Sequence, residues 1–94
     1  MRLRARKDDN HIELVAVFRT LGFSVMDTAS LGNGCPDLMC ARNNQTWAIE
    51  IKDGNKMPSQ RKLTPDEIVF KDTWKGRYAL IESVADVLAL VRNI

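Results

Sequence analysis

The sequence predicts a single α/β domain in which helices flank a mixed β-sheet. A length of 94 residues bounds the chain to one domain, and 45% hydrophobic with 28% charged residues is a globular composition. Helical and strand-like patterns follow one another in the order helix, three strands, helix, strand, helix. A meander that feeds a crossover helix and a returning strand combines antiparallel and parallel pairs in one sheet.

The first helix is predicted to follow a basic arm. Residues 1–7 contain four Arg or Lys side chains and are expected to form this mobile arm. The Asp-Asp-Asn segment at 8–10 can cap a helix and favour its positive end. The helix should run to about Leu21, because Gly22 is a typical C-terminal stop. Its apolar stripe consists of Leu14, Val17, Phe18 and Leu21.

Three strands are predicted after this helix. The polar pair Asn43-Asn44 is expected to form the turn between the second strand and the third. A Gly-Asn-Gly loop at 32–34 precedes the second strand and allows backbone to approach a ligand closely, although a plain turn explains it equally well. Trp47 is expected in the core rather than stacked on a base. The strands are expected at residues 23–28, 38–42 and 46–52.

A polar loop at residues 53–63 leads to the second helix. Thr64-Pro65-Asp66-Glu67 is a strong helix start, since Thr64 is a capping residue and Pro65 suits the first helical position. Glu67 then closes a capping box, and we prefer this duty for Glu67 to metal binding. The helix should end near Gly76.

The chain is expected to finish with a strand at 77–82 and a helix that Ser83 caps and that ends near Asn93. A helix that is apolar over so much of its girth is usually covered on more than one side. Together with Phe70 and Trp74 it can face the sheet and a partner chain, which predicts a homodimer; the alternative is that a small domain uses these residues for its own core. The apolar residues of the final helix are Val84, Val87, Leu88, Leu90, Val91 and Ile94.

The composition excludes several classes of protein. No apolar run approaches the roughly 20 residues of a transmembrane helix, and no apolar signal-peptide core follows the basic N-terminus, so a cytoplasmic location is expected. The net charge of +2 does not by itself indicate a nucleic-acid binder. Cys35, Cys40 and the single histidine, His11, are too few for a zinc site, so reduced and partly buried thiols are expected.

The candidate site combines two acids and one amine. Asp37 follows Pro36, and the hairpin after it brings back a strand that carries Glu50 and Lys52. Side chains two apart on a strand project to the same face, so Glu50 and Lys52 should point together. The simpler alternative is a solvated hairpin with a surface salt bridge between Asp37 and Lys52, worth under about 1 kcal/mol.

These residue types suit phosphodiester hydrolysis. Such a reaction needs a cation that neutralises the phosphate and a water that is nucleophilic near neutral pH. Mg²⁺ prefers hard oxygen ligands, usually one or two carboxylates with waters and substrate phosphate. Asp37 and Glu50 are suitable carboxylates for Mg²⁺ or Mn²⁺, while Lys52 can orient or deprotonate the attacking water or stabilise developing charge.

The pattern resembles the active-site signature of the PD-(D/E)xK nuclease superfamily, and within it the virus-type replication-repair nuclease (VRR-Nuc) domain, often a small phage protein. The pieces occur in the family's order, cover the chain from about His11 onward, and together make a fairly specific match. Glu67 stands where the family commonly has Gln, so no role of that Gln is transferred. The matching pieces are 34–38 (Gly-Cys-Pro-Asp-Leu), 47–52 (Trp-Ala-Ile-Glu-Ile-Lys), 63–65 (Leu-Thr-Pro), and Trp74-x-Gly76 before a strand.

The resemblance implies a restriction-endonuclease-like fold and a metal-dependent, structure-selective DNA endonuclease. It further implies branched substrates, Holliday junctions foremost, and products with 5′-phosphate ends. The backbone carbonyl of Ile51 is implied as a metal ligand. Glu13 on the first helix is implied to complete the metal site, although an ordinary flanking charge is the simpler interpretation. Two alternatives remain open: a non-catalytic DNA-binding module on the same fold, and a restriction-type endonuclease, for which little chain is left as a recognition element.

Contacts with the DNA backbone are expected from the loop that follows the candidate site. Lys56, Arg61 and Lys62 are long basic side chains that can reach flanking phosphates. The alternative is an ordinary solvated loop. The predicted partners are therefore branched DNA and a second copy of the chain.

Overall fold

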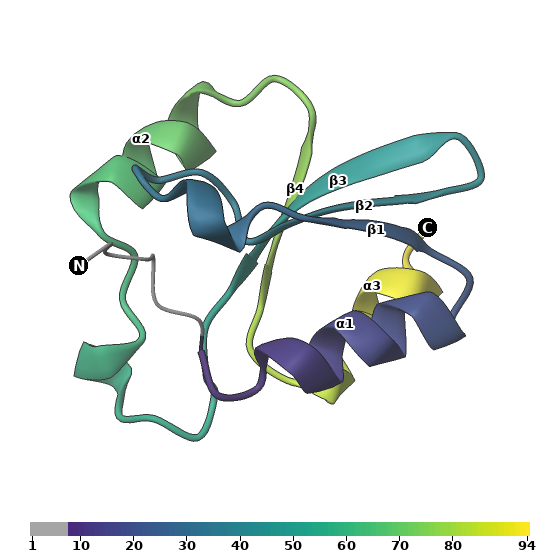
Figure 1. The fold of residues 1–94 in the computed structure, drawn as a ribbon, viewed down its shortest axis with the longest axis horizontal. Coiled ribbons are helices and arrows are strands. Elements are labelled where there is room, and N and C mark those ends of the chain that lie inside the picture. Colours follow the sequence, from purple (N-terminus) through teal and green to yellow (C-terminus); the bar gives the residue numbers. More distant parts are fainter. Residues whose placement is uncertain (1–7) are drawn as a thin grey trace.

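The computed structural model describes residues 8–94, so the predicted basic arm at 1–7 lies outside the described residues. Three α-helices and a four-stranded mixed sheet form the fold, which confirms the predicted α/β class. The strands lie in the order β1-β2-β3-β4 (Figure 1). The helices are α1 His11–Thr20, α2 Pro65–Thr73 and α3 Val84–Arg92. The strands are β1 Ser24–Asp27, β2 Leu38–Arg42, β3 Gln45–Ile51 and β4 Arg77–Ile81.

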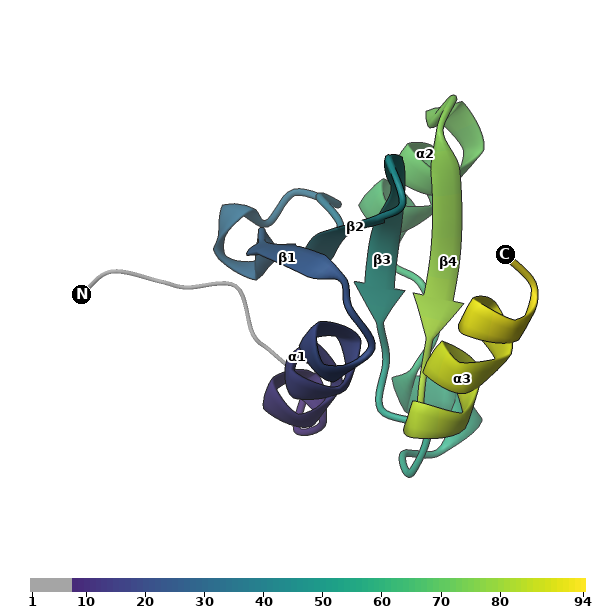
Figure 2. The same cartoon turned by 90° about the vertical axis from the view of Figure 1, so that its right-hand side faces the viewer.

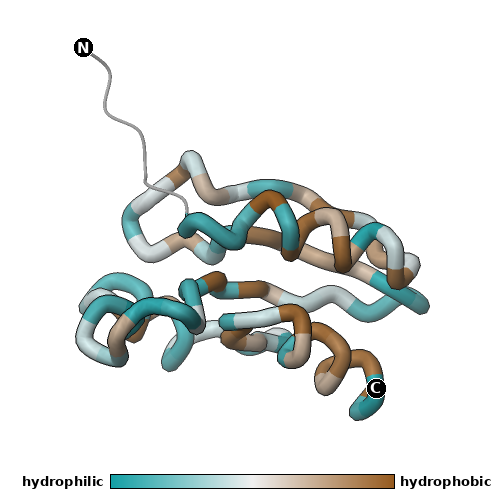
Figure 3. Tube along the Cα trace, turned by 90° about the horizontal axis from the view of Figure 1, so that it is seen from below, coloured by the Kyte–Doolittle hydropathy of each residue, from teal (hydrophilic) through white to brown (hydrophobic). Residues whose placement is uncertain are grey.

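The sheet separates two layers of helix. Helices α1 and α3 lie side by side over one face, and α2 lies behind the other (Figure 2). β1, β2 and β3 pair antiparallel, whereas β4 runs parallel to β3 because α2 carries the chain back across the sheet. Tracing the chain by hydropathy shows that the helix ending at the C-terminus is largely hydrophobic (Figure 3), as the sequence predicts.

The core lies between the sheet and the α1–α3 layer. Leu14 and Phe18 of α1 and Val87 of α3 are fully buried there. Trp47 is 3% exposed and its ring meets Phe23 edge-on at 5.7 Å, so its predicted place in the core is confirmed. The sheet contributes Leu38, Cys40, Ile49, Ile51 and Ile81 to the same cluster. Glu50 alternates with Ile49 and Ile51 along β3, so it projects to the opposite face, toward α2.

Local signals explain the turn and the helix ends. Asn43 and Asn44 have φ angles of 53° and 63°, which is the conformation of a two-residue hairpin turn that Asn tolerates. Thr64 accepts a hydrogen bond from the Glu67 N–H while the Glu67 side chain accepts one from the Thr64 N–H, so the predicted capping box is confirmed. Ser83 caps α3 as predicted.

The side chain of Asn10 does not cap α1, although the sequence predicts a capping role for it. Asn10 occupies the N-cap position of α1, but its side chain makes no capping hydrogen bond. Its Nδ2 instead donates to the carbonyl oxygens of Lys52 and Glu82, each at 3.2 Å. These carbonyls lie just beyond the ends of β3 and β4, so Asn10 ties the start of α1 to the end of the sheet.

No helix among residues 8–94 has the length and hydrophobicity that crossing a membrane requires.

Candidate active site

Asp37 is held in place at the entry to β2. Gly34 has a φ of 82°, and a Cβ there would lie 2.5 Å from the Asp66 carbonyl oxygen, so only glycine lets this loop pack on the start of α2. The Thr28 N–H donates to the Asp37 carbonyl at 2.9 Å. The Asp37 carboxylate accepts a hydrogen bond of 2.8 Å from the Ile51 N–H, which fixes it against β3.

Glu50 lies beside Asp37 on the α2 face of the sheet. Leu38 pairs with Ile49 across the antiparallel strands, so Asp37 comes opposite Glu50 one step further. Glu50 is only 3% exposed, which excludes the solvated hairpin. Burial, together with a hydrogen bond to Asp37 and the charge of Asp37, raises the pKa of Glu50 to about 10. Glu50 therefore keeps its proton near neutral pH while it lies beside Asp37.

Lys52 projects to the same face as Glu50 and reaches α2. Its Nζ lies 2.8 Å from Oε1 of Glu67, and both side chains are largely buried. The alternative salt bridge between Lys52 and Asp37 is not formed. Burial opposes the charge of Lys52, but the hydrogen bond and charge of Glu67, with the charge of Glu50, raise the Lys52 pKa. The amine is thus held as an ammonium between Glu67 and the acid pair.

Two further residues belong to this neighbourhood although sequence reasoning did not select them. Burial, followed by the charges of Glu50, Glu67 and Asp37, raises the pKa of Tyr78 to about 12. Burial raises the pKa of Asp8 too; the charge of Lys52 opposes the shift and that of Asp37 adds to it. The pairing of Tyr78 with Ala48 on β3 explains its position, because Ala48 projects to the same face as Glu50. No local pattern indicates that register.

The donor set fits a hard divalent cation. Asp37 and Glu50 offer carboxylate oxygens, and the Ile51 carbonyl points to the same side of β3 as the Ile51 N–H that meets Asp37. Within residues 8–94, no three His, Cys, Asp or Glu side chains are grouped to hold a metal ion. Mg²⁺ does not need such a cage, since it usually binds one or two carboxylates and keeps several waters.

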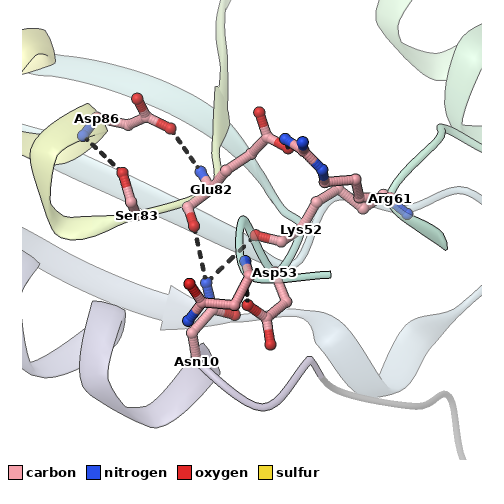
Figure 4. Close-up of polar contacts among 8 residues, drawn as sticks. Asn10, Lys52, Asp53, Arg61, Glu82, Ser83 and Asp86 are labelled. Atoms are coloured by element: carbon pink, nitrogen blue, oxygen red, sulfur yellow. Dashed lines mark hydrogen bonds and ion pairs between the residues drawn. The ribbon is translucent and has the colours of Figure 1, made fainter. Parts of the chain in front are cut away.

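Glu13 lies apart from the acid pair. Its side chain is exposed and borders an open hollow of about 350 Å³, and no hydrogen bond or ion pair joins it to Asp37 or Glu50. Residues around this hollow are shown in Figure 4, where Asn10 bridges Lys52 and Glu82. The metal-binding role of Glu13 stays a prediction that the geometry does not favour. The hollow is also lined by Asn10, Asp53, Arg61, Glu82 and Asp86.

The three basic residues of the loop differ in their surroundings. Lys56 Nζ lies 3.4 Å from the Asp9 carboxylate, and Arg61 Nη1 lies 3.0 Å from the Glu82 carboxylate. Figure 4 shows Arg61 beside Glu82. Lys62 is exposed and has no acidic partner among the described residues. Of the three predicted DNA contacts, Lys62 is therefore the most available.

Both cysteines are free, as expected, but only Cys35 is partly buried. Cys35 is half-buried in the loop before Asp37, and Cys40 is fully buried in β2. Burial raises the pKa of the Cys40 thiol to about 12, so Cys40 behaves as a small apolar core residue.

Comparison with known proteins adds no relative to this picture. No family model, curated protein or solved structure matches the chain. The structure shows a mixed α/β domain, and the function has to be argued from the site.

Proposed function

We propose that this protein is a metal-dependent endonuclease that hydrolyses phosphodiester bonds in branched DNA, four-way junctions foremost. The observation that carries the proposal is the meeting of Asp37 and Glu50 on one buried face of the sheet, beside the ammonium of Lys52. A buried acid with a raised pKa, as Glu50 has beside Asp37, is costly for a fold and is typical of functional sites. The preference for branched DNA rests on the resemblance of the sequence motif.

The roles of the residues follow from their surroundings. Asp37, Glu50 and the Ile51 carbonyl would hold Mg²⁺ or Mn²⁺. When bound, such an ion supplies charge neutralisation of the phosphate and a water that is nucleophilic near neutral pH. The Ile51 N–H keeps Asp37 in position. Lys52 serves as a fixed positive charge near the scissile phosphate rather than as a base, because Glu67 keeps its amine protonated.

Four-way junctions need two cuts, which favours a homodimer with one site per chain. Leu88 and Ile94 at the C-terminal helix are 45% and 50% exposed, so this helix still offers apolar surface after it has packed on the sheet. On the α2 side, Val69 is 60% exposed and Trp74 is 38% exposed.

The exposed Lys62 would supply a contact to the DNA backbone.

A second candidate is a non-catalytic DNA-binding module. The observation that favours it is the short ion pair between Lys52 and Glu67, which occupies the amine that the reaction would use. In that case the acid pair and Lys52 would serve only to join β3 to α2.

Cleavage assays separate the two candidates. Labelled linear, flap and four-way DNA would be incubated with the protein, with and without Mg²⁺ or Mn²⁺. The proposal expects cations to be required and four-way DNA to be cut best. Asp72→Ala is a suitable control for Asp37→Ala, since Asp72 is exposed on α2 and has no partner among residues 8–94. Binding of four-way DNA without any cutting by clean protein would favour the non-catalytic module.

A further inference from the structure

Tyr78 has a feature that the proposed function does not use. Its hydroxyl oxygen is buried and has no hydrogen-bond partner among the described residues. Buried polar groups are almost always paired, and one that is left unpaired destabilises the fold. Such a group is retained most readily where a partner becomes available in another state of the site.

The sheet register places Tyr78 on the same face of the sheet as Glu50. Ala48 pairs with Tyr78 and Glu50 pairs with Leu80 across the parallel strands, so Tyr78 and Glu50 project to the same face of the sheet. The charge of Glu50 is the strongest of the carboxylate charges that act on the Tyr78 phenol. Burial and these charges keep the phenol protonated at neutral pH, and hence a hydrogen-bond donor.

The aromatic ring of Tyr78 is held in place from α2. Phe70 lies 6.5 Å from it, centroid to centroid, and is itself stacked on Trp74 at 5.1 Å. The indole Nε1 of Trp74 donates to the Arg77 carbonyl at 2.9 Å, which links this stack to the start of β4. The phenol therefore has little freedom to turn away from the site.

We infer that Tyr78 is a positioning residue that donates a hydrogen bond from its hydroxyl to the Glu50 carboxylate and so holds Glu50 in its metal-binding orientation. Without a cation, the protonated Glu50 side chain donates hydrogen bonds toward Asp37 and Glu67. When Glu50 binds a cation as a carboxylate it has no proton left to donate, and its oxygens need a hydrogen-bond donor instead. Lys52 is already committed to Glu67 at 2.8 Å, whereas the Tyr78 hydroxyl has no partner within the described part of the chain. Metal-ligating carboxylates commonly receive such an outer hydrogen bond.

This inference rests on the proposed function, and a binding measurement without DNA tests it. Tyr78→Phe removes only the hydroxyl and keeps the ring contact with Phe70. Calorimetric titration with Mn²⁺ should give a dissociation constant about tenfold or more above that of the wild type. Thermal unfolding in a chelator should be unchanged or shifted slightly upward, because the deleted hydroxyl has no partner there.

Two further variants make the result decisive. Asp72→Ala changes an exposed residue of α2 that has no partner among residues 8–94, and its Mn²⁺ affinity should equal that of the wild type. Glu50→Gln should lose binding altogether. If the wild type binds Mn²⁺ through Glu50 while Tyr78→Phe binds equally well, the inference about Tyr78 is wrong and the proposed metal site stands. A wild type that does not bind Mn²⁺, or a Glu50→Gln variant that binds as well as the wild type, would contradict both the inference about Tyr78 and the proposed metal site.

Discussion

At the scale of single residues, Glu50 makes the stability of the metal-free protein depend on pH. Its pKa rises from an ordinary 4.5 to about 10 on folding, so the unfolded chain releases a proton that the folded protein keeps. The free energy of unfolding should therefore fall as pH rises from about 4.5 toward about 10. Glu50→Gln should flatten this decline, and urea titrations in a chelator between pH 5 and 9 measure it. Glu13→Gln, at an exposed position, should leave the decline intact; a Glu50→Gln curve parallel to the wild type would contradict the burial argument.

Glu67 offers a second test at the same scale. Glu67→Gln keeps an oxygen for the capping box but removes the charge that neutralises Lys52. We expect the variant to fold, to lose about 1–2 kcal/mol of stability, and to cleave DNA at least as fast as the wild type, since the ammonium becomes more available to phosphate. Rates under single-turnover conditions decide this. A large loss of rate would assign Glu67 a direct part in the site.

At the scale of elements, α2 depends on its first turn to carry Glu67 and Phe70 to the sheet. Thr64→Ala removes a cap and should lower the free energy of unfolding by about 1 kcal/mol. Ser83→Ala removes the equivalent cap of α3 and is the matched control. Chemical denaturation should give similar losses for both, whereas only Thr64→Ala should also reduce cleavage. Equal effects on cleavage would show that α2 has no special link to the site.

The elements also show which information the sequence contains. The caps at Thr64 and Ser83 and the turn at Asn43-Asn44 are local signals, and each is confirmed. The bridge from Asn10 to the strand ends spans 42 and 72 residues, and it depends on how α1 meets the sheet. Pairing of β4 with β3 likewise decides that Tyr78 faces the acids. Local patterns do not determine either arrangement.

At the scale of the whole molecule, the predicted homodimer would place two active sites on one four-way junction. Leu88 is exposed on α3, so Leu88→Asp should weaken self-association while leaving the fold intact. Light scattering at micromolar concentration should give a mass of two chains for the wild type and of one for the variant. A wild-type mass of one chain, with junctions still cut in pairs, would show that DNA assembles the dimer.

Cleavage of a labelled four-way junction by wild type and Asp37→Ala is the most direct measurement of whether the acid pair is catalytic. We predict Mg²⁺-dependent paired nicks for the wild type and a rate lower by about a thousandfold or more for Asp37→Ala, because loss of a metal ligand removes several kcal/mol of transition-state stabilisation. DNA binding should largely survive the change, since phosphate contacts elsewhere carry affinity. Full activity of a folded Asp37→Ala protein, or metal-independent cutting by the wild type, would contradict the proposed site.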